Sequence, residues 1–190
     1  MKIAILAWGS LVWNPETLAV VGNFEPSGPH LPIEFSRVSG GGRLTLVIDE
    51  IAGTACSTYY ALSEFEELQA AIENLREREK MPNSRGVGFV NLAAKQDSDA
   101  AIARHPQAVA AIKKWAAENG LDAVIWTALA SNFHEPGKAA ETFTSEAAVR
   151  YLEGLDEPSF GRAIEYIRQA PPEVRTPVRT ATNIRWPTGP

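Results

Sequence analysis

Two short stretches of this chain carry residue types that can do chemistry on a small molecule, and the first is a turn at Gly9-Ser10. The run from Ile3 to Ala7 is continuously apolar, which predicts a buried strand. It leads into Gly9, which allows close backbone approach, and Ser10, which adds a hydroxyl. Backbone N–H groups in such a turn suit an anion or a developing oxyanion. The alternative is an ordinary strand end packed by Trp8 and Trp13.

The second stretch is a predicted helix that ends in charged residues. Ser63 and Glu66 have the spacing of a capping box, which predicts a helix start. The apolar residues on one face are Phe65, Leu68, Ile72 and Leu75. The next step of four falls on Glu79, and a carboxyl group directed at the core tends to have a raised pKa, as a general acid/base requires. The alternative is that the last turn frays, so that Glu79 reaches solvent or pairs with Arg76 or Arg78.

Other reactive side chains give weaker signals. The single cysteine, Cys56, lies in an apolar strand, so a buried small hydrophobe is favoured over a nucleophile. His134 and Glu135 are neighbours in a predicted loop, and a surface position is favoured over a base or a metal ligand. The histidines His30, His105 and His134 lack the spacing of metal ligands. The sequence therefore predicts no metal and no cofactor.

The composition indicates an ordinary globular protein. Of 190 residues, 45% are hydrophobic and 22% charged, with a net charge of −5 and no basic block, which argues against nucleic acid and anionic membrane as partners. One cysteine cannot form an internal disulfide, and no apolar run approaches the roughly 20 residues of a membrane helix. We expect a soluble, cytoplasmic protein with a single domain over residues 1–190.

The elements that must position these residues follow an irregular order. Two alternating runs around Gly40 to Gly42 predict a hairpin. In its first strand Ile33 and Phe35 alternate with Glu34, so we expect that strand to be half-buried. Further strands are predicted over 53–62, 86–92 and 124–129, and helices are predicted to begin at Pro106 and after caps at Thr144 and Ser159. An extended C-terminal tail is predicted from about residue 171, after Pro171-Pro172. Strands and helices that do not alternate regularly favour an α+β fold.

These stretches resemble, in order, a known family. The opening from Trp8 to Pro15 (WGSLVWNP) is similar to the YGSL(I/V)WNP opening of γ-glutamylcyclotransferases of the ChaC type. Leu75 to Glu79 resembles the segment in which that family carries its catalytic glutamate, after a strand that matches 53–62 here. The late segment 123–133, with Asn132 and Phe133, and the segment 165–167 are also similar. Trp8 replaces the family's tyrosine, and the tail beyond about residue 171 has no counterpart.

The resemblance implies a fold and a reaction. The fold is a small, mostly antiparallel β-barrel flanked by helices. In the reaction, the α-amine of a γ-glutamyl compound attacks its own γ-carbonyl, so that 5-oxoproline forms and an amine, amino acid or peptide leaves. Such an intramolecular attack needs no protein nucleophile and no metal, and its effective molarity can reach the order of 10⁵ M.

We expect Glu79 to act as the general acid/base and Trp8, Gly9, Ser10 and Leu11 to form the substrate cradle. Glu77 lies about 200° away around the helix, so Glu77 and Glu79 cannot both face one pocket. Two alternatives remain at this point: a non-catalytic module that binds a small metabolite, and an amide hydrolase that uses Cys56 with a histidine.

Overall fold

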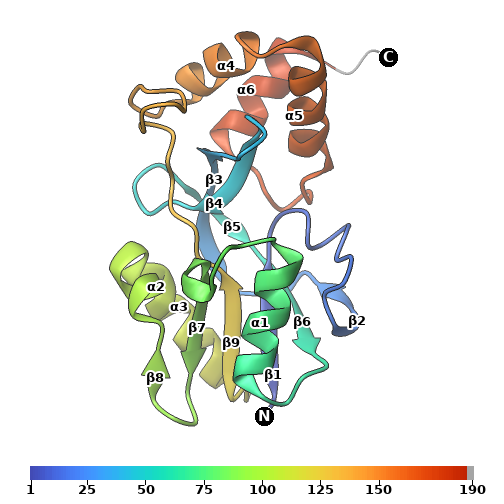
Figure 1. Cartoon of the computed structure of the whole chain (residues 1–190), viewed down its shortest axis with the longest axis vertical. Helices are drawn as coiled ribbons and strands as arrows, with labels where there is room; N and C mark the ends of the chain where they lie inside the picture. The colour runs from blue at the N-terminus through green and yellow to red at the C-terminus, as the bar shows by residue number, and fades with distance from the viewer. Residues whose placement is uncertain (188–190) are drawn as a thin grey trace. The chain divides into compact units, whose positions relative to one another are not determined.

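Nine strands, six α-helices and one short 3₁₀ helix are formed by residues 1–187, the part of the chain that the computed structural model describes (Figure 1). The strands are β1 Ile3–Ala7, β2 Val20–Glu25, β3 His30–Val38, β4 Leu44–Ile48, β5 Thr54–Ser57, β6 Tyr59–Ser63, β7 Val87–Asn91, β8 Gln96–Asp97 and β9 Ala123–Thr127. The helices are α1 Leu68–Arg78, η1 Ser84–Gly86, α2 Asp99–Arg104, α3 Pro106–Glu118, α4 Ser145–Glu153, α5 Glu157–Gln169 and α6 Pro177–Arg185. None of these helices has the length and apolar character to cross a membrane.

The chain divides into two compact units, where a single domain was expected. The first unit combines Met1–Leu31 with Ser57–Leu129, and the second combines Pro32–Cys56 with the chain from Ala130 onward. The predicted α+β class is confirmed, because each unit contains a sheet and α-helices. The strands of residues 1–187 form two open sheets and no closed barrel.

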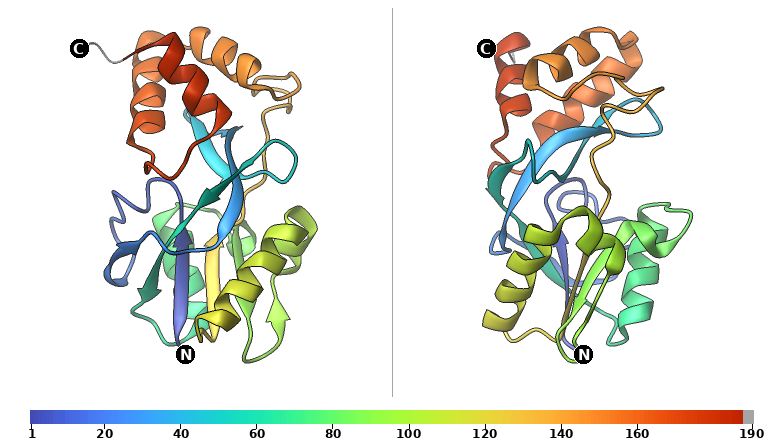
Figure 2. Two further views of the ribbon diagram at one scale, coloured as in Figure 1. Left: turned by 180° about the vertical axis from the view of Figure 1, so that it is seen from behind. Right: turned by 90° about the vertical axis from the view of Figure 1, so that its left-hand side faces the viewer.

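The first unit is built on a mixed six-stranded sheet with the order β2-β6-β1-β9-β7-β8. Strand β1 lies in its middle, parallel to β9 and antiparallel to β6. All five residues of β1 are buried, as the continuous apolar run predicted. Helices α1 and α3 lie on opposite faces of this sheet (Figure 2). Ile3 and Ile5 pack in one core cluster with Ile72 and Leu75 of α1. A strand covered on both faces has no polar side, which explains why its sequence does not alternate.

The strand predicted over 53–62 is two strands in two different sheets. Strand β5 belongs to the three-stranded sheet and β6 to the six-stranded sheet, and Thr58 lies between them. The buried Thr58 hydroxyl donates to the Pro29 carbonyl (2.7 Å), and the Thr58 carbonyl accepts from the Gly28 N–H (2.9 Å). A Cβ at Gly28 would lie 2.4 Å from the Thr58 Oγ1, so this close approach requires glycine. Contacts 29 residues away in sequence therefore divide a continuous β-prone run.

The second unit contains a three-stranded sheet with the order β4-β3-β5, together with α4, α5 and α6. The predicted hairpin is confirmed: β3 and β4 pair antiparallel, with Ile33 opposite Ile48. Asn132 lies beside the end of β3, where its amide both accepts from the Val38 N–H (2.7 Å) and donates to the Val38 carbonyl (3.1 Å). The Thr144 cap is confirmed, since its hydroxyl accepts from the Ala147 N–H (3.0 Å).

Two predictions about the C-terminal part are wrong. Helix α5 is capped by Asp156, three residues before the predicted Ser159, whose N–H donates to the Asp156 carboxylate (2.8 Å). The tail is not extended over Pro177–Arg185, which forms α6 after a Thr176 cap. The prolines suggested extended backbone, but a proline in the first helical turn gives up no intrahelical hydrogen bond. The last three residues of that predicted tail lie outside the described residues.

Candidate functional site

The predicted turn follows β1 directly, within the first unit. Trp8 and Leu11 are both buried, with 4% of each residue exposed, while Gly9 and Ser10 between them are partly exposed. The turn closes through two backbone hydrogen bonds, from the Val12 N–H to the Gly9 carbonyl (3.0 Å) and from the Asn14 N–H to the Ser10 carbonyl (2.7 Å). Within residues 1–187, the N–H groups of Gly9, Ser10 and Leu11 donate to no other residue. The turn therefore offers three backbone donors beside two buried apolar side chains.

The helix that carries Glu79 begins later than the capping box predicted. Helix α1 starts at Leu68, and its N-cap residue, Glu67, forms no side-chain cap. The Ser63 hydroxyl instead accepts from the Phe65 N–H (3.1 Å) at the end of β6. The core-facing positions Ile72 and Leu75 are buried as predicted, whereas Phe65 precedes the helix and is 36% exposed. Ser63, the predicted N-cap, thus pairs with Val20 as the last residue of β6, and residues 64–67 connect the strand to the helix.

Glu79 is the C-cap residue of α1, and the backbone around it forms a Schellman motif. The Lys80 N–H donates to the Glu77 carbonyl (3.0 Å) and the Met81 N–H donates to the Arg76 carbonyl (3.0 Å). Lys80 has φ of 54°, the left-handed conformation that such an ending requires. The helix has therefore ended before the proline at position 82, and the backbone of Glu79 is held on both sides.

The side chain of Glu79 forms an ion pair with Arg78. Its Oε1 lies 2.8 Å from the Arg78 Nη1, and 21% of the Glu79 side chain and 9% of the Arg78 side chain are exposed. The same guanidinium donates from Nε to the Pro15 carbonyl (3.3 Å) and from Nη2 to the Asn14 carbonyl. One of the pairings that the sequence left open for Glu79 is thus present. The partner cation also contacts the segment that leaves the turn.

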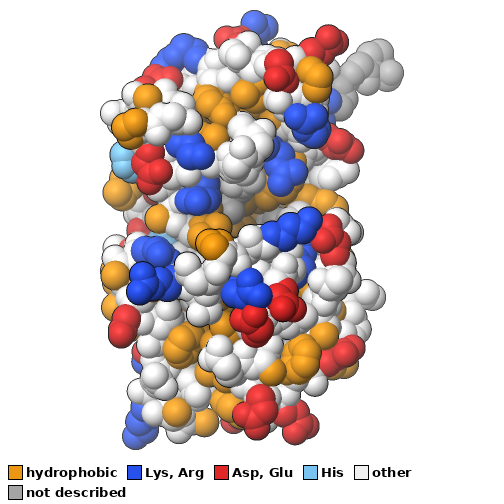
Figure 3. Space-filling view, in the orientation of Figure 1, with side chains coloured by type: hydrophobic (Ala, Val, Ile, Leu, Met, Phe, Trp, Pro, Cys, Tyr) orange, Lys and Arg blue, Asp and Glu red, His pale blue; other side chains and the backbone are white. Residues whose placement is uncertain are grey.

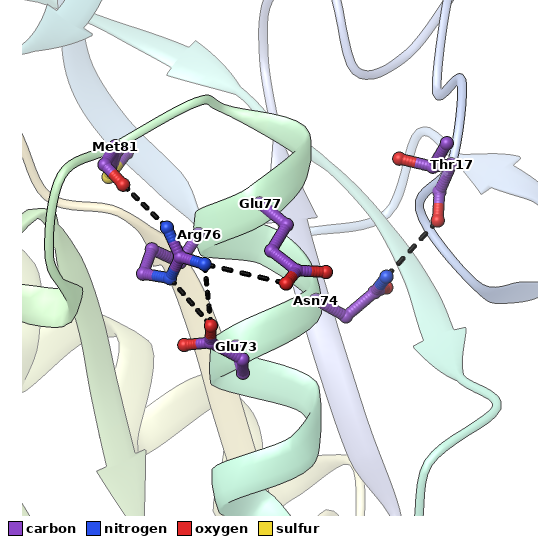
Figure 4. A network of polar contacts seen from close by, with 6 residues as sticks. All are labelled: Thr17, Glu73, Asn74, Arg76, Glu77 and Met81. Atoms are coloured by element: carbon purple, nitrogen blue, oxygen red, sulfur yellow. Dashed lines mark hydrogen bonds and ion pairs between the residues drawn. The ribbon is translucent and has the colours of Figure 1, made fainter.

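A second residue of α1 contacts the same segment one helical turn earlier (Figure 4). The Asn74 side chain accepts from the Ala19 N–H (2.9 Å) and donates to the Thr17 carbonyl (3.1 Å). Asn74 and Arg78 are four residues apart and so lie on one face of the helix. Sequence reasoning did not assign either residue to the site, although two polar side chains at this spacing beside an apolar stripe are a signal that could have found them. Together they hold the backbone of residues 14–19 against α1.

Arg76 and Glu77, which precede the Arg78–Glu79 ion pair in α1, contact other groups. Arg76 binds the Glu73 carboxylate through Nε (2.8 Å) and Nη2 (2.6 Å), and donates to the Met81 carbonyl (2.7 Å; Figure 4). The hydrogen bond from Arg76 lowers the pKa of Glu73. The Glu77 side chain is 63% exposed and lies 3.5 Å from the Arg76 Nη2. Glu77 is therefore a solvent-exposed counterpart to the more enclosed Glu79.

The weaker candidates are a buried cysteine, an exposed His-Glu pair and a histidine beside a serine. Cys56 is 2% exposed in β5, and burial raises the pKa of its thiol, which disfavours the nucleophilic thiolate. His134 and Glu135 are exposed, as expected for a surface loop. The His30 Nε2 lies 3.3 Å from the Ser57 Oγ. In the described part of the chain, no group of three or more His, Cys, Asp or Glu side chains could hold a metal ion.

A carboxylate that the sequence assigned to the polar side of a strand is buried in the second unit. Glu34 on β3 is 1% exposed, so the prediction that this strand is half-buried is wrong. Its Oε1 accepts from the Phe35 N–H (2.7 Å) and its Oε2 from the Val178 N–H (3.4 Å), and the Thr176 side chain also bonds it. Burial raises the pKa of Glu34. Glu34 is buried because α6 covers its carboxylate, through Val178, which lies 144 residues later in the chain.

On the face in Figure 3, acidic and basic side chains both occur, in keeping with a net charge of −5. Comparison with protein-family models, with curated proteins and with solved structures finds no match for this chain.

Proposed function

We propose that this protein is a γ-glutamylcyclotransferase-like enzyme, which converts a γ-glutamyl amide into 5-oxoproline and releases an amine, amino acid or peptide. One observation carries the proposal most directly: the guanidinium of Arg78, whose side chain is 9% exposed, contacts both the Glu79 carboxylate and the backbone that leaves the 8–11 turn. The two stretches with chemical potential, about 70 residues apart in sequence, therefore share one contact network. The proposal does not require the closed β-barrel of the resembled family, because the first unit provides a mixed sheet with helices on both faces (Figure 2).

The proposed reaction uses a nucleophile that the substrate itself carries. The α-ammonium first loses a proton to the Glu79 carboxylate. The resulting amine attacks the γ-carbonyl carbon, a C–N bond forms, and the carbonyl oxygen becomes an oxyanion. When this intermediate collapses, the bond to the leaving nitrogen breaks and that nitrogen takes the proton back from Glu79. The ring nitrogen gives its second proton to the leaving amine, which departs as an ammonium group. General acid/base catalysis of this kind contributes about 10²–10⁴-fold.

The turn would supply the charge stabilisation. The N–H groups of Gly9, Ser10 and Leu11 donate to no other described residue, so they can donate to the substrate's α-carboxylate or to the oxyanion. Removing one donor to an oxyanion typically costs about 10²–10³-fold in rate. Trp8 and Leu11, both buried, would keep the backbone between them in place.

A non-catalytic module that binds a small metabolite is the second candidate, and two observations favour it. The Glu79 Oε1 already lies 2.8 Å from the Arg78 Nη1, so one carboxylate oxygen is engaged before any substrate binds. Trp8 is buried and lacks the hydroxyl that the tyrosine of the resembled family carries at this position. Turnover separates this candidate from the enzyme.

The decisive test is release of 5-oxoproline from a panel of γ-glutamyl compounds that includes glutathione. Wild type, Glu79→Gln and the matched control Glu77→Gln are compared, since Glu77 is an exposed glutamate two positions away. We expect wild type and Glu77→Gln to form product at equal rates and Glu79→Gln to be at least about 10²-fold slower. A folded Glu79→Gln variant with full activity would overturn the assignment of Glu79. Saturable binding of a γ-glutamyl compound without product would favour the binding module.

A further inference from the structure

Arg78 is the most enclosed charged side chain at this site, and its contacts point in two directions. With 9% of its side chain exposed, it binds Glu79 at one end of α1 and the carbonyls of Asn14 and Pro15 on the segment after the turn. We infer that Arg78 is a positioning residue, which holds the Glu79 carboxylate and the Trp8–Leu11 turn in one fixed arrangement. The inference rests on the proposed function, because it assigns Arg78 a role in that reaction.

The geometry of the guanidinium suits this role better than its charge alone. Its Nε, Nη1 and Nη2 each donate to a different acceptor. Two are the carbonyls of Pro15 and Asn14, which lie 63 and 64 residues before Arg78, and the third is the carboxylate of the neighbouring Glu79. A planar guanidinium presents its donors in a rigid fork, whereas a lysine ammonium is a compact charge on a flexible stem. Lysine at position 78 would therefore keep the positive charge but could not donate to the two carbonyls and the carboxylate from one rigid group.

The backbone that Arg78 contacts needs external support. Glu16, next to Pro15, has φ of 52°, a left-handed conformation that is unfavourable for residues other than glycine. Such conformations persist where the surrounding structure holds them in place. Arg78 contacts residues 14 and 15 on one side of Glu16, and Asn74 contacts residues 17 and 19 on the other. Removal of the Arg78 side chain should therefore loosen residues 14 and 15, which lead back to the turn, while Asn74 still holds residues 17 and 19.

Arg76 provides a matched control on the same helix. It also binds a carboxylate and a backbone carbonyl, those of Glu73 and Met81, but neither lies on the segment after the turn (Figure 4). Replacing Arg76 removes an arginine, an ion pair and a carbonyl contact of the same kinds. Any effect confined to Arg78 variants is then due to its particular partners.

The test compares wild type, Arg78→Gln, Arg78→Lys and Arg76→Gln by two readouts. The first is amide hydrogen exchange of Val12 and Asn14, whose N–H groups close the turn, and the second is kcat and KM on a γ-glutamyl compound that wild type turns over. We expect Arg78→Gln to exchange these amides at least about tenfold faster and to lose about 10²-fold in kcat, since misplacement by about 1 Å can cost that much. Arg78→Lys should resemble Arg78→Gln, and Arg76→Gln should match wild type in both readouts.

The outcomes separate this inference from the proposed function. Restoration of kcat by Arg78→Lys would overturn the inference, because charge alone would then suffice. Unchanged exchange at Val12 and Asn14 or unchanged kcat in Arg78→Gln would overturn it as well, even while Glu79→Gln abolishes turnover and the proposed function stands. If wild type turns over no γ-glutamyl compound, the proposed function fails, and the role of Arg78 in that reaction is overturned with it. If Arg78→Gln fails to fold, Arg78→Lys carries the comparison.

Discussion

Two carboxylates, one in each unit, are enclosed in opposite ways. Glu79 lies at the C-terminal end of α1, is 21% exposed and has an arginine as its counterion. Glu34 lies on β3, is 1% exposed and accepts hydrogen bonds from the Phe35 and Val178 N–H groups. Val178 belongs to the first turn of α6, where the helix dipole favours a negative charge. One carboxylate is therefore held by a cation and the other by backbone donors.

The difference shows that depth of burial alone does not identify a catalytic group. Glu34 is the more deeply buried of the two, and desolvation raises its pKa, as expected for a general acid/base. Its oxygens, however, are occupied by the N–H groups of Phe35 and Val178 and by Thr176, and a general base must come within hydrogen-bond reach of the substrate's proton. Glu79 is less buried and retains exposed surface. We therefore expect Glu34 to have a structural role, and the catalytic role of Glu79 stays a prediction.

The largest expected effect tests this assignment in activity. Glu79→Gln should lower 5-oxoproline formation at least about 10²-fold, while Glu34→Gln, which keeps the shape of the side chain, should stay within about threefold of wild type. The measurement is kcat/KM of each variant on the same γ-glutamyl substrate. An inactive, folded Glu34→Gln variant would reverse the comparison between the two carboxylates.

The next effect is on stability, for which we expect replacement of Glu34 to cost more than replacement of Glu79, the reverse of the expected effect on activity. Glu34→Ala leaves the Phe35 and Val178 N–H groups buried without an acceptor, so the free energy of unfolding should fall by about 2–3 kcal/mol. Glu79→Ala removes a partly exposed carboxylate and should cost no more than about 1 kcal/mol. Urea unfolding of both variants measures these differences. Equal losses would mean that α6 does not depend on Glu34.

A smaller effect is the pH dependence that Glu34 confers. Burial raises the pKa of Glu34 in the folded state above the ordinary value of 4.5, which the unfolded chain keeps. Between these two values the folded protein binds more protons, so this group makes the free energy of unfolding fall as pH rises through the window. Glu34→Gln has no such titration. As pH is lowered through the window, the free energy of unfolding of wild type should therefore rise relative to that of Glu34→Gln. A difference that stays constant with pH would contradict the raised pKa of Glu34.

The smallest expected effect concerns the helix ending that holds Glu79. Lys80 adopts φ of 54°, which costs a lysine about 1–2 kcal/mol relative to its favoured conformations. Lys80→Gly removes that cost but adds backbone entropy to the unfolded state, so the net gain should be about 0.5–1 kcal/mol. Thermal unfolding measures it, and Lys95→Gly is a suitable control because Lys95 has φ of 55° away from the site. Destabilisation by Lys80→Gly would show that the lysine side chain supports this end of α1.

Some features followed from local sequence alone. The apolar run of β1, the hairpin around Gly40 to Gly42 and the Thr144 cap were predicted correctly, because periodicity, turn residues and capping act within a few residues. The same holds for Ile72 and Leu75 on the buried face of α1. The sequence also singled out Glu79 and the turn at Gly9 as the two places with chemical potential, and their role in catalysis stays a prediction.

Tertiary contacts decided what local patterns did not determine. The break at Thr58 depends on the Gly28–Pro29 backbone, the burial of Glu34 depends on α6, and the partners of Arg78 lie 63 and 64 residues earlier in the chain. In each case a backbone group from a distant segment satisfies a polar side chain. Every backbone segment offers the same N–H and carbonyl groups, so no residue type marks the partner in advance. The sequence therefore determined which residues are available for chemistry, and only the folded chain decided which of them face a partner.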